Sequence, residues 1–118
     1  HPSDLASHSC LLHRSIAPDA TWRFDGPDGQ VAVKVAGPLL TNSVFALRAG
    51  ALAGLGVTLL PTYFIEDDIR SGQLVEVFKD YDPPRRPIYV LYPHARYLPL
   101  KTRLFIDFLR AYVRRQNW

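Results

Sequence analysis

The stretch between Thr41 and Pro61 constrains the fold of this chain more than any other part of its sequence. Apolar residues recur there at spacings of three and four as far as Leu55, which is the pattern of one face of a helix. Three residues at its start have short polar side chains that favour a helix N-cap: Thr41, Asn42 and Ser43. We therefore predict a helix from about Asn42 to Leu55.

Two short apolar segments flank this predicted helix. On its C-terminal side, Gly54 and Gly56 can supply the left-handed residue that ends a helix, and Val57–Leu60 predicts a strand buried on both faces. On its N-terminal side, Val31–Val35 predicts a second strand, which Gly37–Pro38 would interrupt. A strand, a helix and a strand in this order predict a parallel, right-handed βαβ unit.

The rest of the chain alternates between strand and helix patterns. Turn residues separate short apolar runs throughout, and the final helix carries apolar residues on one face and basic residues on the other. The further elements we expect are a helical turn at 2–6, a strand at 9–13, a hairpin over 21–35, a helix at 63–70, a strand at 74–78, a strand at 87–92 and a helix from 99 to near the C-terminus.

Composition excludes several classes of protein. With 118 residues and 47% hydrophobic residues, the chain can bury the core of one modest domain. Its apolar runs are too short for a membrane span, and the net charge of +3 is too weak and scattered to indicate nucleic-acid binding. A single cysteine fits a reducing, cytoplasmic compartment. The opening His1–Asp4 lacks a methionine and an apolar signal, so we expect a piece of a longer protein.

An ordered series of short motifs runs along nearly the whole chain. The motifs are Pro2–Leu5, Cys10–Leu11, Trp22–Phe24, Gly37–Asn42, Ala53–Val57, Leu60–Pro61, Gly72–Val75, Tyr92–Pro93 and Lys101–Leu109. Taken together, they resemble the C-terminal part of the effector-binding (substrate-binding) domain of a LysR-type transcriptional regulator. The resemblance implies an α/β fold, namely a truncated subdomain like those of type 2 periplasmic binding proteins, with a mixed sheet and flanking helices.

The resemblance also implies a domain organisation and a function. Residues from about 9 to 80 would form the second subdomain, and residues from about 86 to 116 would return a strand and a helix to the first. A small-molecule effector would bind between the subdomains and modulate a dimer or tetramer of the bacterial regulator on DNA. The DNA would be held only by an N-terminal winged helix-turn-helix that this chain lacks, so we expect weak, non-specific DNA binding here.

Two other classes of function remain open. One is half of a periplasmic-type solute-binding protein, which would share the fold. The other is a small α/β enzyme, but the sequence offers no nucleophile–base pair and no glycine-rich phosphate loop. We therefore predict a protein that is not an enzyme and that needs no cofactor.

The turn before the predicted central helix is the candidate effector site. A helix N-terminus offers free N–H groups and a positive dipole end, which suit the carboxylate of an organic acid. The loop after the strand at 87–92 would face the same cleft. The alternatives are that the turn only caps the helix and that this loop is merely solvated. The expected effector-binding residues are Pro38, Leu40, Thr41, Asn42, Ser43 and His94.

Other reactive-looking residues have simpler interpretations. His8, Cys10 and His13 have a spacing that suggests zinc, but a strand would place Cys10 and His13 on opposite faces, so we predict no metal site and a buried, apolar Cys10. The acidic run Glu66–Asp68 is expected to serve solubility. Four arginines are expected to form a solvated helix face: Arg103, Arg110, Arg114 and Arg115.

Exposed apolar residues predict that the chain associates with a second copy of itself. The central helix has a spare face that includes Phe45, Ala49 and Ala53. The C-terminal strand and helix would lack their usual sheet partners, which leaves further apolar residues to be covered: Ile88, Val90, Leu104, Phe105 and Phe108.

Overall fold

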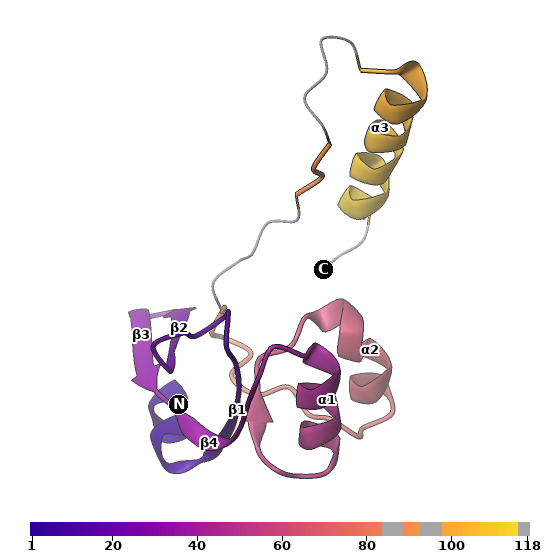
Figure 1. Cartoon of the computed structure of the whole chain (residues 1–118). Helices are drawn as coiled ribbons and strands as arrows, with labels where there is room; N and C mark the ends of the chain where they lie inside the picture. The colour runs from indigo at the N-terminus through magenta and orange to yellow at the C-terminus, as the bar shows by residue number, and fades with distance from the viewer. Residues whose placement is uncertain (84–88, 93–97, 116–118) are drawn as a thin grey trace. The chain divides into compact units, whose positions relative to one another are not determined.

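The computed structural model describes residues 1–83, 89–92 and 98–115 of the chain. It divides into two compact units, His1–Arg85 and Arg86–Trp118. The first unit holds a short 3₁₀ helix and most of the regular elements shown in Figure 1. These elements are the 3₁₀ helix Pro2–Ser7, β1 Ser9–His13, β2 Thr21–Gly26, β3 Gly29–Lys34, β4 Ala36–Thr41, α1 Val44–Leu52, β5 Val57–Thr58 and α2 Thr62–Arg70. The second unit contains α3, Leu100–Arg115.

A three-stranded sheet with the order β4-β1-β5 organises the first unit, and both of its strand pairs are parallel. The helix α1 connects β4 to β5 and lies against one face of the sheet. Gly50 is the point of close approach, because a Cβ there would lie 2.9 Å from Leu11 Cδ1 and 3.5 Å from Leu39 Cδ2. Leu47, one turn earlier, is fully buried.

The predicted βαβ unit was wrong, because its first strand lies in a different sheet from its second. A parallel βαβ unit does exist, and it is formed by β4, α1 and β5. Val31–Val35 does not enter the three-stranded sheet, because most of it forms β3, which pairs only with β2. The strand before α1 is β4, so Gly37 and Pro38 lie within a strand where we expected a break. Pro38 is tolerated because β4 is an edge strand.

Gly37 is required in β4 because the neighbouring strand approaches it so closely. A Cβ at this position would lie 2.0 Å from the carbonyl oxygen of Cys10 in β1. The register shift between Ser9 and Leu11 occurs at this same point of the ladder. Gly37, which we expected to interrupt a strand, therefore allows β4 to approach β1 closely.

The predicted hairpin over 21–35 is confirmed. The antiparallel register runs from the pair Thr21–Lys34 to the pair Gly26–Gly29, and Gly29 has a φ of +112° in the turn. The hairpin contributes Trp22 and Phe24 to the core of the unit. The buried residues of this core are Leu5, Cys10, Leu12, Ala17, Trp22, Phe24, Val33 and Val35.

The helix α2 confirms the prediction for residues 63–70, and Gly72, with a φ of +75°, follows its end. The expectation for the acidic run was wrong at one residue. Asp68 is 4% exposed and pairs with Arg48 of α1, so it joins the two helices. Glu66 and Asp67 do remain exposed, and both pair with Arg70.

The predicted strand at 74–78 is absent, although its residues alternate. Gln73 and Leu74 both donate their N–H groups to the Asp68 carbonyl at the end of α2, which holds the segment away from the edge of the sheet. Val75 is 80% exposed, so the alternating pattern has no sheet surface on which to bury its apolar side. The strand predicted at 57–60 is also shorter than expected, and β5 is only half-buried.

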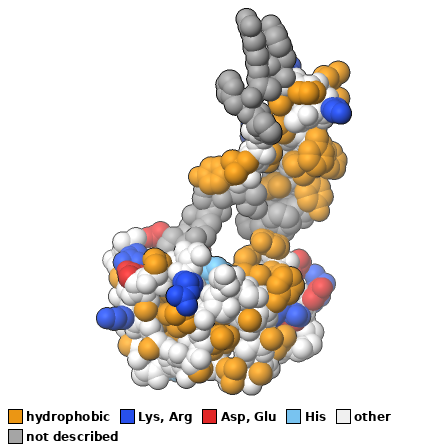
Figure 2. Space-filling model, viewed as in Figure 1, with side chains coloured by type: hydrophobic (Ala, Val, Ile, Leu, Met, Phe, Trp, Pro, Cys, Tyr) orange, Lys and Arg blue, Asp and Glu red, His pale blue; other side chains and the backbone are white. Residues whose placement is uncertain are grey.

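The second unit consists of α3 and the residues before it. The predicted C-terminal helix is confirmed, and Figure 2 shows hydrophobic side chains gathered on its visible face. Within the predicted strand at 87–92, Pro87 and Ile88 lie outside the described residues, and Tyr89–Tyr92 are exposed and form no strand. Among the helices of the described residues, none is both long and apolar enough to cross a membrane.

Candidate functional site at two strand ends

The carboxyl ends of β1 and β4 lie side by side and form the candidate site. His13 is in register with Thr41, and the Arg14 N–H donates to the Thr41 carbonyl at 2.8 Å. The chain then enters α1 directly after Asn42 and Ser43. In parallel sheets, the crevice beyond the carboxyl ends of the strands is the usual place for a ligand. The structure therefore places Thr41, Asn42 and Ser43 beside the end of β1, and their predicted role in binding stays a prediction.

The predicted capping of α1 is confirmed. Ser43 Oγ accepts the N–H of Ala46 at 3.3 Å, and Thr41 Oγ1 accepts the N–H of Ser43 at 3.1 Å. Accepting a bond leaves each hydroxyl with its own hydrogen available for donation. The two hydroxyls therefore organise the turn and still offer donors to a ligand, while the Asn42 side chain is exposed.

His13 is the functional candidate that sequence reasoning missed. Its Nε2 lies 3.1 Å from the Asn42 carbonyl oxygen, and its Nδ1 accepts the N–H of Ser15 at 3.3 Å. A carbonyl only accepts, so the contact with Asn42 is one in which Nε2–H donates. The signal was present in the sequence, because His13 ends a predicted strand, but the sequence predicted no partner for that strand.

Leu40 and Pro38 lie on β4, the strand that leads to the candidate site, and their predicted role stays a prediction. Neighbouring residues of a strand point to opposite faces, so Leu40 points away from the face that Leu39 turns to α1. Leu40 is 51% exposed and lines a separate cavity of about 280 Å³ with Leu12 and Arg14. Pro38 is exposed on the edge strand. His94 lies outside the described residues, so its predicted role stays a prediction.

Cys10 is buried, whereas His8 is exposed and His13 is half-buried, so the three residues considered for a metal site lie in different environments. The thiol is fully buried, and its Sγ lies 3.6 Å from the His8 carbonyl oxygen. Burial raises the pKa of the Cys10 thiol, which disfavours the thiolate that a metal or a nucleophilic reaction requires. Among the described residues, no group of three or more His, Cys, Asp and Glu side chains is placed to hold a metal ion.

Arg48 and Asp68 support the helix that carries the site. The Arg48 guanidinium holds the pKa of the Asp68 carboxyl below its usual value through hydrogen bonds, against the opposing effect of burial. Arg48 also lies 6.0 Å from the centre of the Phe64 ring, which packs edge-on against Phe45. These contacts fix α1 against α2 and so hold the N-terminus of α1 in position.

Comparison with known proteins identifies the family. The family model described as the LysR substrate binding domain matches residues 1–114. The chain is 35% identical to the HTH-type transcriptional regulator PtxR of Pseudomonas aeruginosa, over 98% of this chain and 37% of that protein. It is 32% identical to the HTH-type transcriptional activator AaeR of Escherichia coli, over 94% of this chain and 36% of that protein. The chain thus spans little more than a third of these relatives.

Solved structures give the same result for the fold. The full-length Vibrio cholerae virulence activator AphB, described as a member of the LTTR protein family, matches with a TM-score of 0.77 and 32% identity over 95% of this chain and 38% of that one. The regulatory domain of AphB from Vibrio vulnificus matches with a TM-score of 0.73 and 35% identity over 95% of this chain and 55% of that one. The α/β fold expected from the sequence is therefore correct, and the chain belongs to the LysR substrate-binding domain family.

Proposed function

We propose that this chain is the effector-sensing part of a LysR-type transcriptional regulator and that it binds a small organic acid at the ends of β1 and β4. The observation that carries the proposal is the register of His13 with Thr41, which puts two strand ends beside the N-terminus of α1. The main-chain N–H groups and the positive dipole end of a helix N-terminus favour a carboxylate. The named relatives are transcriptional regulators, which favours this function over solute transport or catalysis.

The division of the chain supports a proposal for the intact protein. We assign residues from about 9 to 80 to the second subdomain and residues from about 86 to 116 to the return into the first, in keeping with the boundary between the two compact units. Pro38, Leu40 and His94 would then line the cleft further from the carboxylate. A helix-turn-helix module, which the names of the relatives indicate, would hold the DNA in the cytoplasm.

The regulatory mechanism follows from linkage. An effector that binds one arrangement of the subdomains more tightly than another shifts the population toward that arrangement. In a dimer, the shift changes how the two DNA-binding modules are presented, and DNA in turn changes the affinity for the effector. The Asn42 side chain is suited to distinguish effectors, because it is exposed and because Ser43, not Asn42, caps the helix.

Titration of carboxylates followed by amide NMR tests the proposal. Benzoate and aliphatic carboxylates of increasing size are added to the chain, with their methyl esters as uncharged controls. At least one carboxylate is expected to shift the amides of Thr41–Ser43 and Ala46 saturably, while its ester does not. Asn42→Ala should weaken this binding, and Gln30→Ala, an exposed amide on β3, should not. Equal shifts with esters and acids, or no saturable shift, would contradict the proposal.

A further inference from the structure

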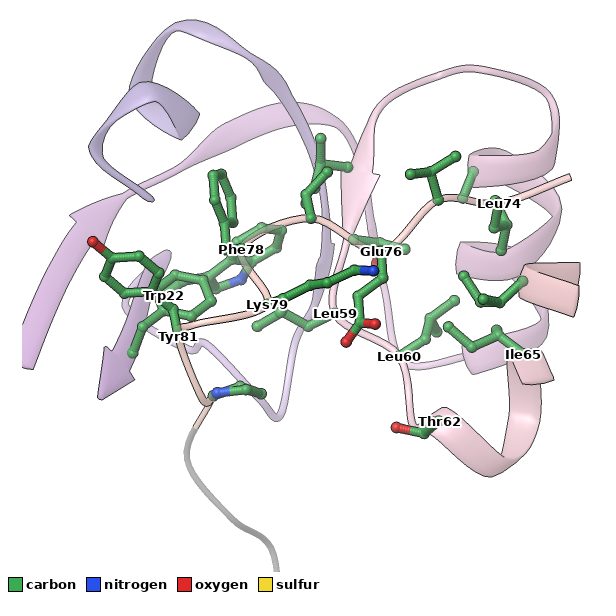
Figure 3. Close-up of a pocket in the computed structure, with 18 of the residues that line it drawn as sticks. Trp22, Leu59, Leu60, Thr62, Ile65, Leu74, Glu76, Phe78, Lys79 and Tyr81 are labelled. Carbon is green, nitrogen blue, oxygen red and sulfur yellow. The ribbon is translucent and has the colours of Figure 1, made fainter. Parts of the chain in front are cut away.

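The first unit contains a cavity of about 660 Å³ that shares no lining residue with the strand-end site. Its walls come from β2, from β5 and the residues that follow it, from α2, and from the segment 73–83 (Figure 3). The volume falls in the range of pockets that bind small molecules.

The walls of this cavity are apolar at both ends. Figure 3 shows Trp22, Phe78 and Tyr81 together at one end, and Leu60, Ile65 and Leu74 toward the other. Trp22 is only 2% exposed in total, so its ring is held firmly in the core and backs this end of the cavity. An aromatic end and an aliphatic end suit an occupant whose whole body is hydrocarbon.

The segment 73–83, which we call the strap, closes one side of the cavity. It is tied at one end to the Asp68 carbonyl through Gln73 and Leu74, and at the other by reciprocal hydrogen bonds between Asp82 and Asp25 of 2.8 and 2.9 Å. Between these two ties, the Tyr81 N–H donates a main-chain hydrogen bond to the Phe78 carbonyl. The strap is thus anchored at both of its ends.

Phe78 holds an unusual conformation in the middle of the strap. Its φ is +60°, a left-handed value that a bulky residue adopts only where its surroundings require it. Its ring packs edge-on against Phe24 at 6.3 Å and against Tyr81 at 6.4 Å between ring centres. The backbone is therefore turned so that an aromatic ring faces the cavity wall.

The charges around the cavity decide the class of ligand. Among the described residues, no buried side-chain nitrogen or oxygen lacks a hydrogen-bond partner, so the interior requires no polar group from an occupant. Around the lining, Glu66, Glu76 and Asp82 outnumber Arg70 and Lys79, and Arg70 already pairs with Glu66. The charged groups of the lining are thus net negative, which disfavours a carboxylate. We propose that this cavity is a second ligand site, which takes an uncharged aromatic or aliphatic molecule and is independent of the organic-acid site.

Fluorescence of N-phenyl-1-naphthylamine, an uncharged aromatic probe, tests this site. The chain has two tryptophans, so Trp118→Phe leaves Trp22 as the only donor for energy transfer to the probe. Saturable binding at one site with transfer from Trp22 is expected. 1-Decanol should displace the probe at a concentration at least tenfold lower than decanoate does. Displacement by decanoate at the same or a lower concentration would overturn the uncharged class.

Matched variants show whether the probe lies under the strap. Val77 and Leu55 are both 51% exposed, but only Val77 lines the cavity, so Val77→Glu should weaken probe binding at least tenfold and Leu55→Glu should leave it unchanged. Circular dichroism confirms that both variants fold. Phe105→Asp, which alters the exposed face of α3, should also have no effect. Loss of binding with Phe105→Asp, or equal loss with both glutamates, would mean surface adsorption and would overturn the proposal.

Discussion

Arg48 and Asp68 form a bidentate ion pair across α1 and α2, with Nε donating to Oδ2 at 2.5 Å and Nη2 donating to Oδ1 at 2.6 Å. Asp68 is nearly buried, and its carbonyl also accepts the N–H groups that begin the strap. Asp68 therefore connects α1, which carries the candidate effector site, to the strap, which covers the cavity of about 660 Å³.

Removing the carboxylate of this pair should destabilise the first unit. Asp68→Asn keeps the shape of the side chain but leaves the Arg48 guanidinium facing a neutral amide, so a clear fall in the urea midpoint is expected. Arg70→Ala is the matched control, because its pairs with Glu66 and Asp67 are exposed and should contribute no more than about 1 kcal/mol. Equal effects of the two changes would contradict the structural role of Asp68.

The same pair predicts how stability depends on pH. Arg48 lowers the pKa of Asp68 in the folded chain from its ordinary value of 3.8, so the folded state binds the proton less readily than the unfolded state. The stabilisation by this ion pair is fully present at a pH above 3.8. It is lost as the pH falls through the lower pKa that Asp68 has in the folded chain. Urea unfolding across this range should show the wild type and Asp68→Asn converging in acid. A difference that stays constant with pH would contradict the assignment. The exposed Asp4 and Asp19, whose pKa values are also lowered, are common to both proteins and cancel in the comparison.

The cap of α1 predicts a modest but specific loss of stability. Ser43→Ala removes the oxygen that accepts the Ala46 N–H, and the free energy of unfolding should fall by about 1 kcal/mol. Ser43→Asp should retain most of the stability, since its carboxylate also caps. Chemical denaturation monitored by far-ultraviolet circular dichroism measures both. A Ser43→Ala chain as stable as the wild type would show that the bond does not form.

Two glycines should respond very differently to the same added methyl group. Gly37→Ala places a Cβ about where the Cys10 carbonyl oxygen lies, so β4 should separate from β1 and the cooperative unfolding transition should be lost. Gly54→Ala meets no atom within 4 Å, but its φ of +74° makes the change cost about 1 kcal/mol. Thermal unfolding compares the two. A cooperative Gly37→Ala transition near that of the wild type would contradict the close approach.

Self-association remains a prediction, and α3 carries the strongest reason for it. Phe105 is 58% exposed and Phe108 62%, and exposed apolar residues grouped in this way usually mark a contact surface. Sedimentation equilibrium should find a dimer, and Phe105→Asp should return it to a monomer with its helix content intact. A wild-type monomer at micromolar concentrations would show that these residues need no partner.

Features that depend on residues close together in the sequence were predictable, whereas features that depend on contacts between distant residues were not. The hairpin and the Ser43 cap were predictable because turn residues and a capping oxygen act within a few positions. The role of Gly37 was not, because it depends on a main-chain contact with Cys10, far away in the sequence. The alternating pattern at 74–78 failed for the same reason, since a strand forms only where it pairs with another strand, and the bonds of Gln73 and Leu74 to the Asp68 carbonyl hold this segment away from the sheet. His13 was overlooked in the candidate site because recognising it required the correct partner for β1.

The order β4-β1-β5 has a consequence for how the chain acquires its structure. Of the three strands in this sheet, the central strand comes first along the chain, β4 follows it after the hairpin, and β5 follows after α1. Leu11 and Leu12 of β1 therefore pair with residues that are distant in the sequence. Bringing such distant residues together makes folding slow relative to a helical protein of the same size. During synthesis, one edge of β1 therefore stays unpaired until Val57 and Thr58 have emerged.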